Sequence, residues 1–177
     1  MAVVMPIPKS VTENPQQISC RPAGYQDLPN LLKIEQSAFP PERWASEASL
    51  NQRLELPDSV TLIAFLKTIP VGFANGFPVS DCSTQETLDQ DDSILYSKGS
   101  NYWLLRNVAV HQSFQSTGVG KFLIQAQLAA ARKYGAKYLR FTATENLTSY
   151  YQSLGFQMIH PAKYFHGLPQ AVFQSEF

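Results

Sequence analysis

The sequence has no long hydrophobic run and no excess of charge of either sign. A typical apolar stretch, residues 60–66, has the length of a single strand, far short of the 18 or more residues of a membrane-spanning helix. Fourteen Lys and Arg residues balance fourteen Asp and Glu residues, and charged residues make up only 16% of the chain. Because phosphate and anionic lipid surfaces are bound by clustered excess cations, this balance argues against a general nucleic-acid binder or a polybasic membrane binder.

Cysteine is also scarce. The two cysteines, Cys20 and Cys82, form neither a metal-spaced pair nor a disulfide framework, which favours a reducing compartment and predicts no metal site. Residues 1–17 lack the basic start and the apolar segment of a secretory signal. We therefore expect a cytoplasmic protein whose residues 1–17 form a flexible tail.

What the chain does contain is enough apolar material for a folded core. Apolar residues make up 44% and aromatic residues 12% of its 177 residues, which excludes a disordered acidic or basic protein. This length corresponds to one domain. We expect a single domain over residues 18–177.

Strand and helix patterns alternate along the chain. The predicted strands are residues 18–21, 60–66, 71–77, 102–110, 138–143, 155–159 and 171–177, and the predicted helices are residues 28–39, 46–54, 118–134 and 147–154. This order predicts an α/β (α+β) domain with a mixed central sheet of about seven strands, flanked by about four helices. The polar stretch of residues 78–100 is predicted to be either a functional loop or a partly ordered one.

The most informative segment is the end of the strand at residues 102–110 and the turn that follows it. Gly118 and Gly120 open the next helix, where unpaired backbone amides and the positive end of the helix dipole attract anions. Because glycine has no Cβ, a bulky anion can approach the backbone closely. A pyrophosphate fits this arrangement without a lysine cluster.

Two common nucleotide motifs do not match this turn. A P-loop requires glycine five residues before Gly120 and Ser or Thr after the lysine, but the chain has Gln115 and Phe122 there. The three glycines of a Rossmann fingerprint are absent as well. Both nucleotide-binding readings are therefore excluded.

A third family does match. Gln115-x-x-Gly118-x-Gly120 after Val108-Ala-Val110 resembles the Q/R-x-x-G-x-G/A acetyl-CoA signature of the GNAT N-acetyltransferases. Downstream, residues 150–156 (YYQSLGF) resemble the second signature of that family, Y-x-x-x-G-F. The resemblance implies a GNAT fold whose sheet is splayed at the acetyl-CoA site.

One branch of the superfamily is more similar than the others. The segments 34–41, 84–88, 108–114 and 150–156 are similar to parts of the arylalkylamine (serotonin-type) N-acetyltransferases, and Phe39-Pro-Pro-Glu42 resembles their microbial and fungal members. The resemblance extends from Ile18 to Phe177.

The resemblance implies a role for particular residues. Acetyl-CoA, a co-substrate, would be bound by Val108, Ala109, Val110, Gln115, Ser116, Thr117, Gly118, Val119, Gly120 and Lys121. Tyr151 would be the catalytic acid that protonates the leaving thiolate, because a phenol with a pKa near 10 is protonated at neutral pH. Tyr150 is the competing tyrosine, and it would point in another direction on a helix.

The proton acceptor is harder to assign. Vertebrate serotonin-type enzymes carry a His-x-His pair at the positions of Leu104 and Arg106, and neither of these residues can serve as a base. Glu35, Glu42 and Glu145 are candidate bases or water-holding residues. If Arg106 faces the acceptor it favours a carboxylate or phosphate group there, whereas a neutralising carboxylate such as Glu35 would leave room for an arylalkylamine.

Candidate acceptor-binding residues are Phe39, Pro40, Leu104 and Arg106, with further aromatic rings available from Trp44 and the 60–77 hairpin. The function that we expect is transfer of acetyl from acetyl-CoA to the primary amine of a small, aromatic amine, by direct attack in a ternary complex. The alternatives are acetylation of a protein N-terminus or lysine, and a non-catalytic acyl-CoA sensor. No nucleic-acid or membrane partner is expected, and the chain would be a monomer or homodimer.

Overall fold

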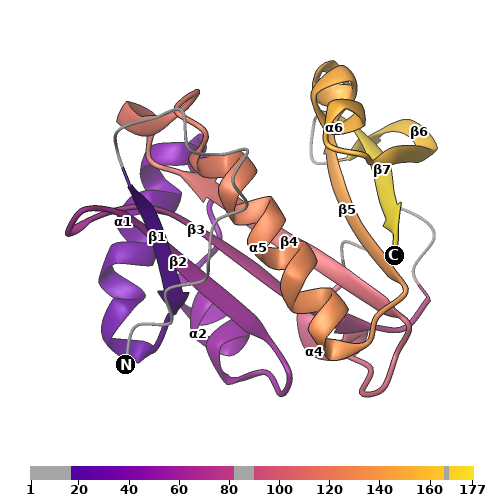
Figure 1. Cartoon of the computed structure of the whole chain (residues 1–177), viewed down its shortest axis with the longest axis horizontal. Coiled ribbons are helices and arrows are strands. Elements are labelled where there is room, and N and C mark those ends of the chain that lie inside the picture. The colour runs from indigo at the N-terminus through magenta and orange to yellow at the C-terminus, as the bar shows by residue number, and fades with distance from the viewer. Residues whose placement is uncertain (1–16, 82–89, 166–167) are drawn as a thin grey trace. The chain divides into compact units, whose positions relative to one another are not determined.

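The computed structural model describes residues 17–81, 90–165 and 168–177. Nearly all of the expected tail 1–17, together with Cys82 and the segment 84–88, lies outside these residues. Seven strands form one mixed sheet in the order β1-β2-β3-β4-β5-β7-β6 (Figure 1). The α/β fold class and the seven-stranded sheet predicted from the sequence are therefore confirmed.

The strands are β1 (Ile18–Pro22), β2 (Val60–Leu66), β3 (Ile69–Val79), β4 (Tyr102–Val110), β5 (Tyr138–Thr144), β6 (Gln157–Phe165) and β7 (Leu168–Glu176). The helices of the described part are α1 (Leu28–Ala38), α2 (Glu47–Glu55), α4 (Asp92–Leu95), α5 (Val119–Tyr134) and α6 (Thr148–Ser153). Short 3-10 turns precede or follow several of them. The extra helix relative to the sequence expectation is α4.

The chain forms two compact units. Unit 1 comprises the chain up to Glu55, residues 59–75 and residues 107–127, and unit 2 comprises residues 56–58, 76–106 and 128–177. The boundary passes through β3, β4 and α5. Each unit has its own hydrophobic core.

The core of unit 1 lies between α1, α2 and the sheet. Leu31 and Ile34 follow helical spacing on α1 and are buried against Phe73 of β3 and Ala109 of β4. In Figure 1, α1 and α2 lie behind the β1–β2 ribbon. The apolar stripe of α1 therefore fixes this helix on one face of the sheet.

The described core cluster of unit 2 takes its buried residues from β3, α4, β4 and β7. β5 pairs antiparallel with β7 from Tyr138↔Glu176 to Thr144↔Gln170, and the first three residues of β4 pair parallel with β5. Phe77, Leu95 and Val172 pack together there. The opening of the sheet that the resemblance implies at the acetyl-CoA site stays a prediction.

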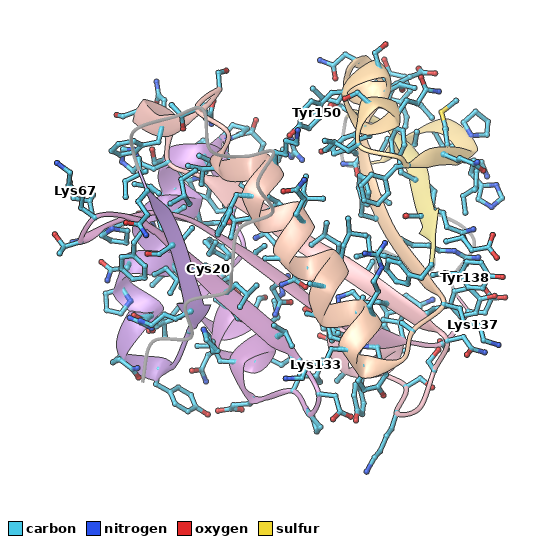
Figure 2. The ribbon with its side chains drawn as sticks, in the orientation of Figure 1. Cys20, Lys67, Lys133, Lys137, Tyr138 and Tyr150 are labelled. Atoms are coloured by element: carbon cyan, nitrogen blue, oxygen red, sulfur yellow. The ribbon has the colours of Figure 1, made fainter. Side chains whose placement is uncertain are left out.

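The structure corrects several element boundaries. The turn between β2 and β3 is only two residues long, with Lys67 in the left-handed region at φ 55° and its side chain directed away from the ribbon (Figure 2). The helix α4 begins inside the predicted polar loop because Asp91 accepts a hydrogen bond from the Ser93 amide and caps it. β6 continues through Pro161, which an edge strand with shifted register tolerates.

Unit 1 contains one very close approach between a strand and a helix. A Cβ on Gly72 of β3 would lie 2.9 Å from the Ala109 carbonyl oxygen, 3.0 Å from a Val119 methyl and 3.1 Å from a Leu123 methyl. The neighbouring Phe73 packs on the α1 side, so Gly72 faces α5. Glycine at position 72 therefore lets the start of α5 settle directly on β3.

We expect Gly72→Ala to lower the free energy of unfolding by about 1–3 kcal/mol, because the added methyl overpacks a contact with backbone. Urea denaturation of the two proteins measures the change. Gly120→Ala is the matched control: its Cβ would meet only a Val110 methyl at 3.7 Å, and alanine favours a helix. Equal stability of the Gly72→Ala and wild-type proteins would contradict the close approach.

Candidate functional site

The turn from β4 to α5 has an unusual backbone. Ser116 has φ 62° and Gly118 has φ 91°, so two residues close together adopt the left-handed region. Alternation of left- and right-handed residues turns successive backbone N–H groups to the same side, forming a concave anion site. A Cβ placed on Gly118 has no atom within 4 Å, so the space beside this residue is open.

The first turn of α5 adds further donors. The Phe122 amide donates to the Gly118 carbonyl at 2.9 Å, which is the first bond of the helix. The amides of residues 118–121 consequently have no acceptor within the helix. Val119 is completely buried, which fixes the direction in which this turn points. Four amide donors and the positive end of the helix dipole therefore meet at the Gly118 turn.

The edge of β4 next to this turn also carries backbone groups. The His111 amide donates to the Val71 carbonyl at 2.8 Å, so His111 directs its backbone toward β3. Because successive strand residues direct their N–H and C=O groups to alternate edges, Val110 and Val108 direct theirs to the opposite edge. The Val110 carbonyl accepts from the Gln115 side chain at 3.3 Å.

Side chains inside the turn hold its shape. The Thr117 hydroxyl donates to the Phe114 carbonyl, and Gln115 reaches back to β4 as described. His111 accepts from the Ser113 amide at its Nδ1, so it caps the short 3-10 turn that follows β4. His111 is therefore a turn residue.

The geometry of this turn fits the diphosphate of acetyl-CoA. Unit 1 brings together all ten residues that the sequence analysis assigned to acetyl-CoA, residues 108–110 and 115–121. The open space beside Gly118 is where a Cβ would intrude on a bound anion. The donors are backbone amides, which matches the absence of a lysine cluster in the sequence.

The candidate acceptor residues Phe39 and Pro40 lie in the loop that joins α1 to α2. We call residues 39–45 the acceptor loop. The Trp44 Nε1 donates to the Phe39 carbonyl at 2.7 Å, and the Arg43 guanidinium lies 5.3 Å from the centre of the Phe39 ring. Phe39 packs partly into the core of unit 1, and Trp44 is 41% exposed.

Glu35 is the buried acid of this region, with only 2% of its surface exposed. Its Oε1 accepts from the Ala45 amide and its Oε2 from the Asn107 side chain, both at 2.9 Å. The other two candidate bases, Glu42 and Glu145, are exposed. The contact between Glu35 and Asn107 was missed in the sequence, since nothing local to either residue indicates it.

Tyr151 lies on α6 in unit 2, where three aromatic rings pack around it. Its ring centre is 4.6 Å from that of Phe141, 5.2 Å from that of Phe173 and 6.3 Å from that of Phe156. Among the described residues its hydroxyl has no hydrogen-bond partner. The phenol is therefore surrounded mainly by apolar groups while its proton remains available.

Burial raises the pKa of Tyr151 to about 12, with a smaller contribution from the neighbouring Tyr150. Tyr150 is 42% exposed, and burial raises its pKa as well (Figure 2). Both phenols are protonated at neutral pH. Tyr151 differs from Tyr150 in being enclosed by its neighbours.

The two remaining candidate acceptor residues, Leu104 and Arg106, also lie in unit 2. Leu104 is a core residue, 2% exposed and packed with Phe77 and Leu95, so little of its surface is left to contact an acceptor. The Arg106 Nε lies 2.7 Å from an Asp92 carboxylate oxygen, and Arg106 also donates to the Gln90 carbonyl at 3.1 Å.

The sequence left two alternatives for Arg106, namely that it faces the acceptor or that a carboxylate neutralises it. The structure shows neutralisation by a carboxylate. The neutralising residue is Asp92, however, and not Glu35, which is occupied by Ala45 and Asn107. Asp92 could not be recognised as this partner from the sequence, because Asp92 lies in the polar stretch of residues 78–100, which has no recognisable motif. The charge of Arg106 is therefore neutralised and does not argue against a cationic arylalkylamine as the acceptor.

Within the described part of the chain, no cluster of three or more His, Cys, Asp or Glu residues could hold a metal ion. Among the described helices, none is both long enough and apolar enough to cross a membrane.

Comparison with known proteins identifies the family. The sequence pattern of the Acetyltransferase (GNAT) family matches residues 28–156, well over half of the chain. The chain therefore belongs to the GNAT family of acetyltransferases, which use acetyl-CoA. No curated protein sequence matches it.

Solved structures share the fold at low sequence identity. The loading GNATL domain of CurA from Lyngbya majuscula is 14% identical, with a TM-score of 0.74 over 90% of this chain and 98% of that one. The ribosomal-protein-S18-alanine N-acetyltransferase from Escherichia coli is 17% identical, with a TM-score of 0.67 over 90% and 94%. The GphF GNAT-like decarboxylase in complex with isobutyryl-CoA is 14% identical, with a TM-score of 0.70 over 89% and 98%.

The raised pKa of Tyr151 predicts a loss of stability in alkali. The folded protein keeps this proton up to about pH 12, whereas the unfolded chain releases it near pH 10, so stability falls between these values by up to about 2–3 kcal/mol. Urea denaturation at increasing pH should show a smaller loss for Tyr151→Phe than for the wild type. Identical alkaline profiles would mean that Tyr151 is not enclosed.

Proposed function

We propose that this chain transfers the acetyl group of acetyl-CoA to the primary amine of a small, aromatic molecule. The observation that supports this most strongly is the turn before α5, where two left-handed residues, Ser116 and Gly118, and the unpaired amides of residues 118–121 suit a diphosphate. The aromatic acceptor is supported by the resemblance to arylalkylamine N-acetyltransferases and by the rings of the acceptor loop.

On this proposal the β4 edge binds the pantetheine arm. Val108 and Val110 direct backbone groups away from β3, and these groups can pair with an extended amide-containing chain as a neighbouring strand would. A backbone amide of β4 then donates to the thioester oxygen, where negative charge develops during attack. This contribution comes from the main chain, so it is compatible with the buried Ala109 side chain.

Tyr151 is the proposed donor to the leaving sulfur. The acceptor nitrogen, as the neutral amine, forms a bond to the acetyl carbon and loses one proton to solvent, while the C–S bond breaks and the sulfur takes the electron pair. A simple thiol has a pKa of about 8.5, well below that of Tyr151, so complete proton transfer from the phenol is uphill. We infer that Tyr151 mainly stabilises the thiolate by a hydrogen bond, and that solvent completes its protonation.

Acetylation of a peptide N-terminus is the second candidate function. It is supported by the likeness in fold to an N-acetyltransferase of a ribosomal protein. A thiol-release assay with acetyl-CoA against aryl amines, polyamines, amino acids and short peptides separates the two. Preferred turnover of aryl amines supports the first proposal, and preferred turnover of peptides supports the second.

Gly118→Asp should weaken acetyl-CoA binding by at least about a hundredfold, because a side chain and a negative charge enter the proposed diphosphate site. Isothermal titration with acetyl-CoA measures the affinity. Gly99→Asp is the matched control, since Gly99 also has a positive φ of 75° and open space but lies outside this turn. Unchanged affinity in Gly118→Asp would refute the assignment of the turn.

Tyr151→Phe should lower kcat by about 10²–10³-fold, the range typical of one lost hydrogen-bond donor to a developing anion, and leave the affinity for acetyl-CoA nearly unchanged. Steady-state kinetics with the best amine of the panel measure both. Tyr150→Phe, which removes the neighbouring hydroxyl, should have a much smaller effect. If Tyr150→Phe shows the larger loss of kcat, the wrong tyrosine has been assigned.

A further inference from the structure

The surroundings of Glu35 are unusual for a buried carboxylate. The side chain is 2% exposed, and the two donors described above, the Ala45 amide and the Asn107 amide, are both neutral. A buried carboxylate is costly unless its oxygens are satisfied. Each oxygen of Glu35 has one donor, and the two donors come from different segments of unit 1.

These two segments are the acceptor loop and β4, which must lie close together for the proposed function. Ala45 ends the acceptor loop, and Asn107 is the β4 residue immediately before Val108. Glu35 itself lies in the last part of α1. A single side chain therefore joins the loop that carries Phe39 to the strand that would bind the thioester.

Phe39 and Ala45 pack against the apolar core that includes Ala109 of β4, but the described residues of the loop have few other polar links to β4. The bond from Trp44 to the Phe39 carbonyl closes the loop on itself. Ser37, at the end of α1, accepts from the Gln112 amide at 3.0 Å, which ties the helix to the turn after β4 but does not reach the loop. Besides the packing of Phe39 and Ala45 against the core that contains Ala109, the polar attachment of the loop to β4 therefore depends on Glu35.

We propose that Glu35 is a positioning residue that holds the acceptor loop against β4 at Asn107 and thereby sets the affinity for the amine acceptor. The inference rests on the proposed function, because the loop matters for binding only if the amine is held there. It assigns Glu35 a role other than that of a base. A base must reach the proton that it removes, whereas the carboxylate of Glu35 is enclosed and already accepts from two donors.

The variants Glu35→Ala and Glu35→Gln separate these roles. Alanine removes both bonds and leaves the Ala45 and Asn107 donors unpaired. Glutamine can keep both, because its carbonyl oxygen accepts from Ala45 while its amide donates to Asn107 after a flip of that side chain. A positioning role is therefore rescued by glutamine, and a base is not.

Two measurements test the proposal. Amide hydrogen exchange at Ala45, which needs no turnover, should be about tenfold faster in Glu35→Ala and close to the wild-type rate in Glu35→Gln. The KM for the acceptor should rise about tenfold in Glu35→Ala and return toward the wild-type value in Glu35→Gln, with the affinity for acetyl-CoA unchanged in both. Glu47→Ala, an exposed acid at the start of α2, is the matched control and should change neither.

If Glu35→Ala does not fold, Asn107→Ala takes its place, since it breaks one of the two hydrogen bonds and keeps the carboxylate. Asn107→Ala should raise the acceptor KM several-fold.

Loss of kcat in Glu35→Gln together with loss of the acidic limb of the pH profile would identify a base and overturn the proposal. Unchanged Ala45 exchange in Glu35→Ala, or unchanged acceptor KM in Asn107→Ala, would overturn it too. Failure of the wild type to acetylate any amine would instead refute the proposed function, and the exchange experiment would still decide whether Glu35 holds the loop.

Discussion

The close contact between β3 and the start of α5 is the constraint on which the candidate acetyl-CoA site depends. Gly72 leaves no side chain between the strand and the helix, so Val119 and Leu123 pack directly above it. With Val119 fully buried, the first turn of α5 cannot rotate, and its unpaired amides keep one direction. A packing contact in the core thereby orients the groups that suit a diphosphate.

The two halves of the proposed chemistry depend on different physical effects. The turn around Gly118 would attract an anion through backbone dipoles, which do not titrate. The environment of Tyr151 acts through desolvation: Phe141, Phe156 and Phe173 surround the phenol and raise its pKa, which keeps it protonated. A donor of this kind can stabilise a thiolate at any physiological pH without depending on a nearby charge.

In both units, buried charged side chains also hold polar chain segments against the sheet. In unit 1, Glu35 connects the acceptor loop to β4 through neutral donors. In unit 2, Arg106 binds Asp92, and Arg140 of β5 binds Asp81 at 2.7 Å and lies over the Tyr102 ring. The Asp92 carboxylate is only 4% exposed, so loss of Arg106 would leave it buried without this partner, whereas Asp81 is 61% exposed.

The fold and the turn that we propose to bind acetyl-CoA both have local signals in the sequence. Helical spacing, strand length and the positions of Gly118 and Gly120 depend on residues within one or two turns of each other, where backbone sterics and hydrogen bonding act. The partners of Glu35 and Arg140 could not be predicted in this way. Glu35 and Asn107 are 72 positions apart, and Arg140 and Asp81 are 59 apart. Side chains so distant meet only after the strands have paired. The sequence by itself therefore determined the elements and the Gly118 turn that we propose to bind an anion, and the tertiary structure decided which charges are paired and which loop lies against β4.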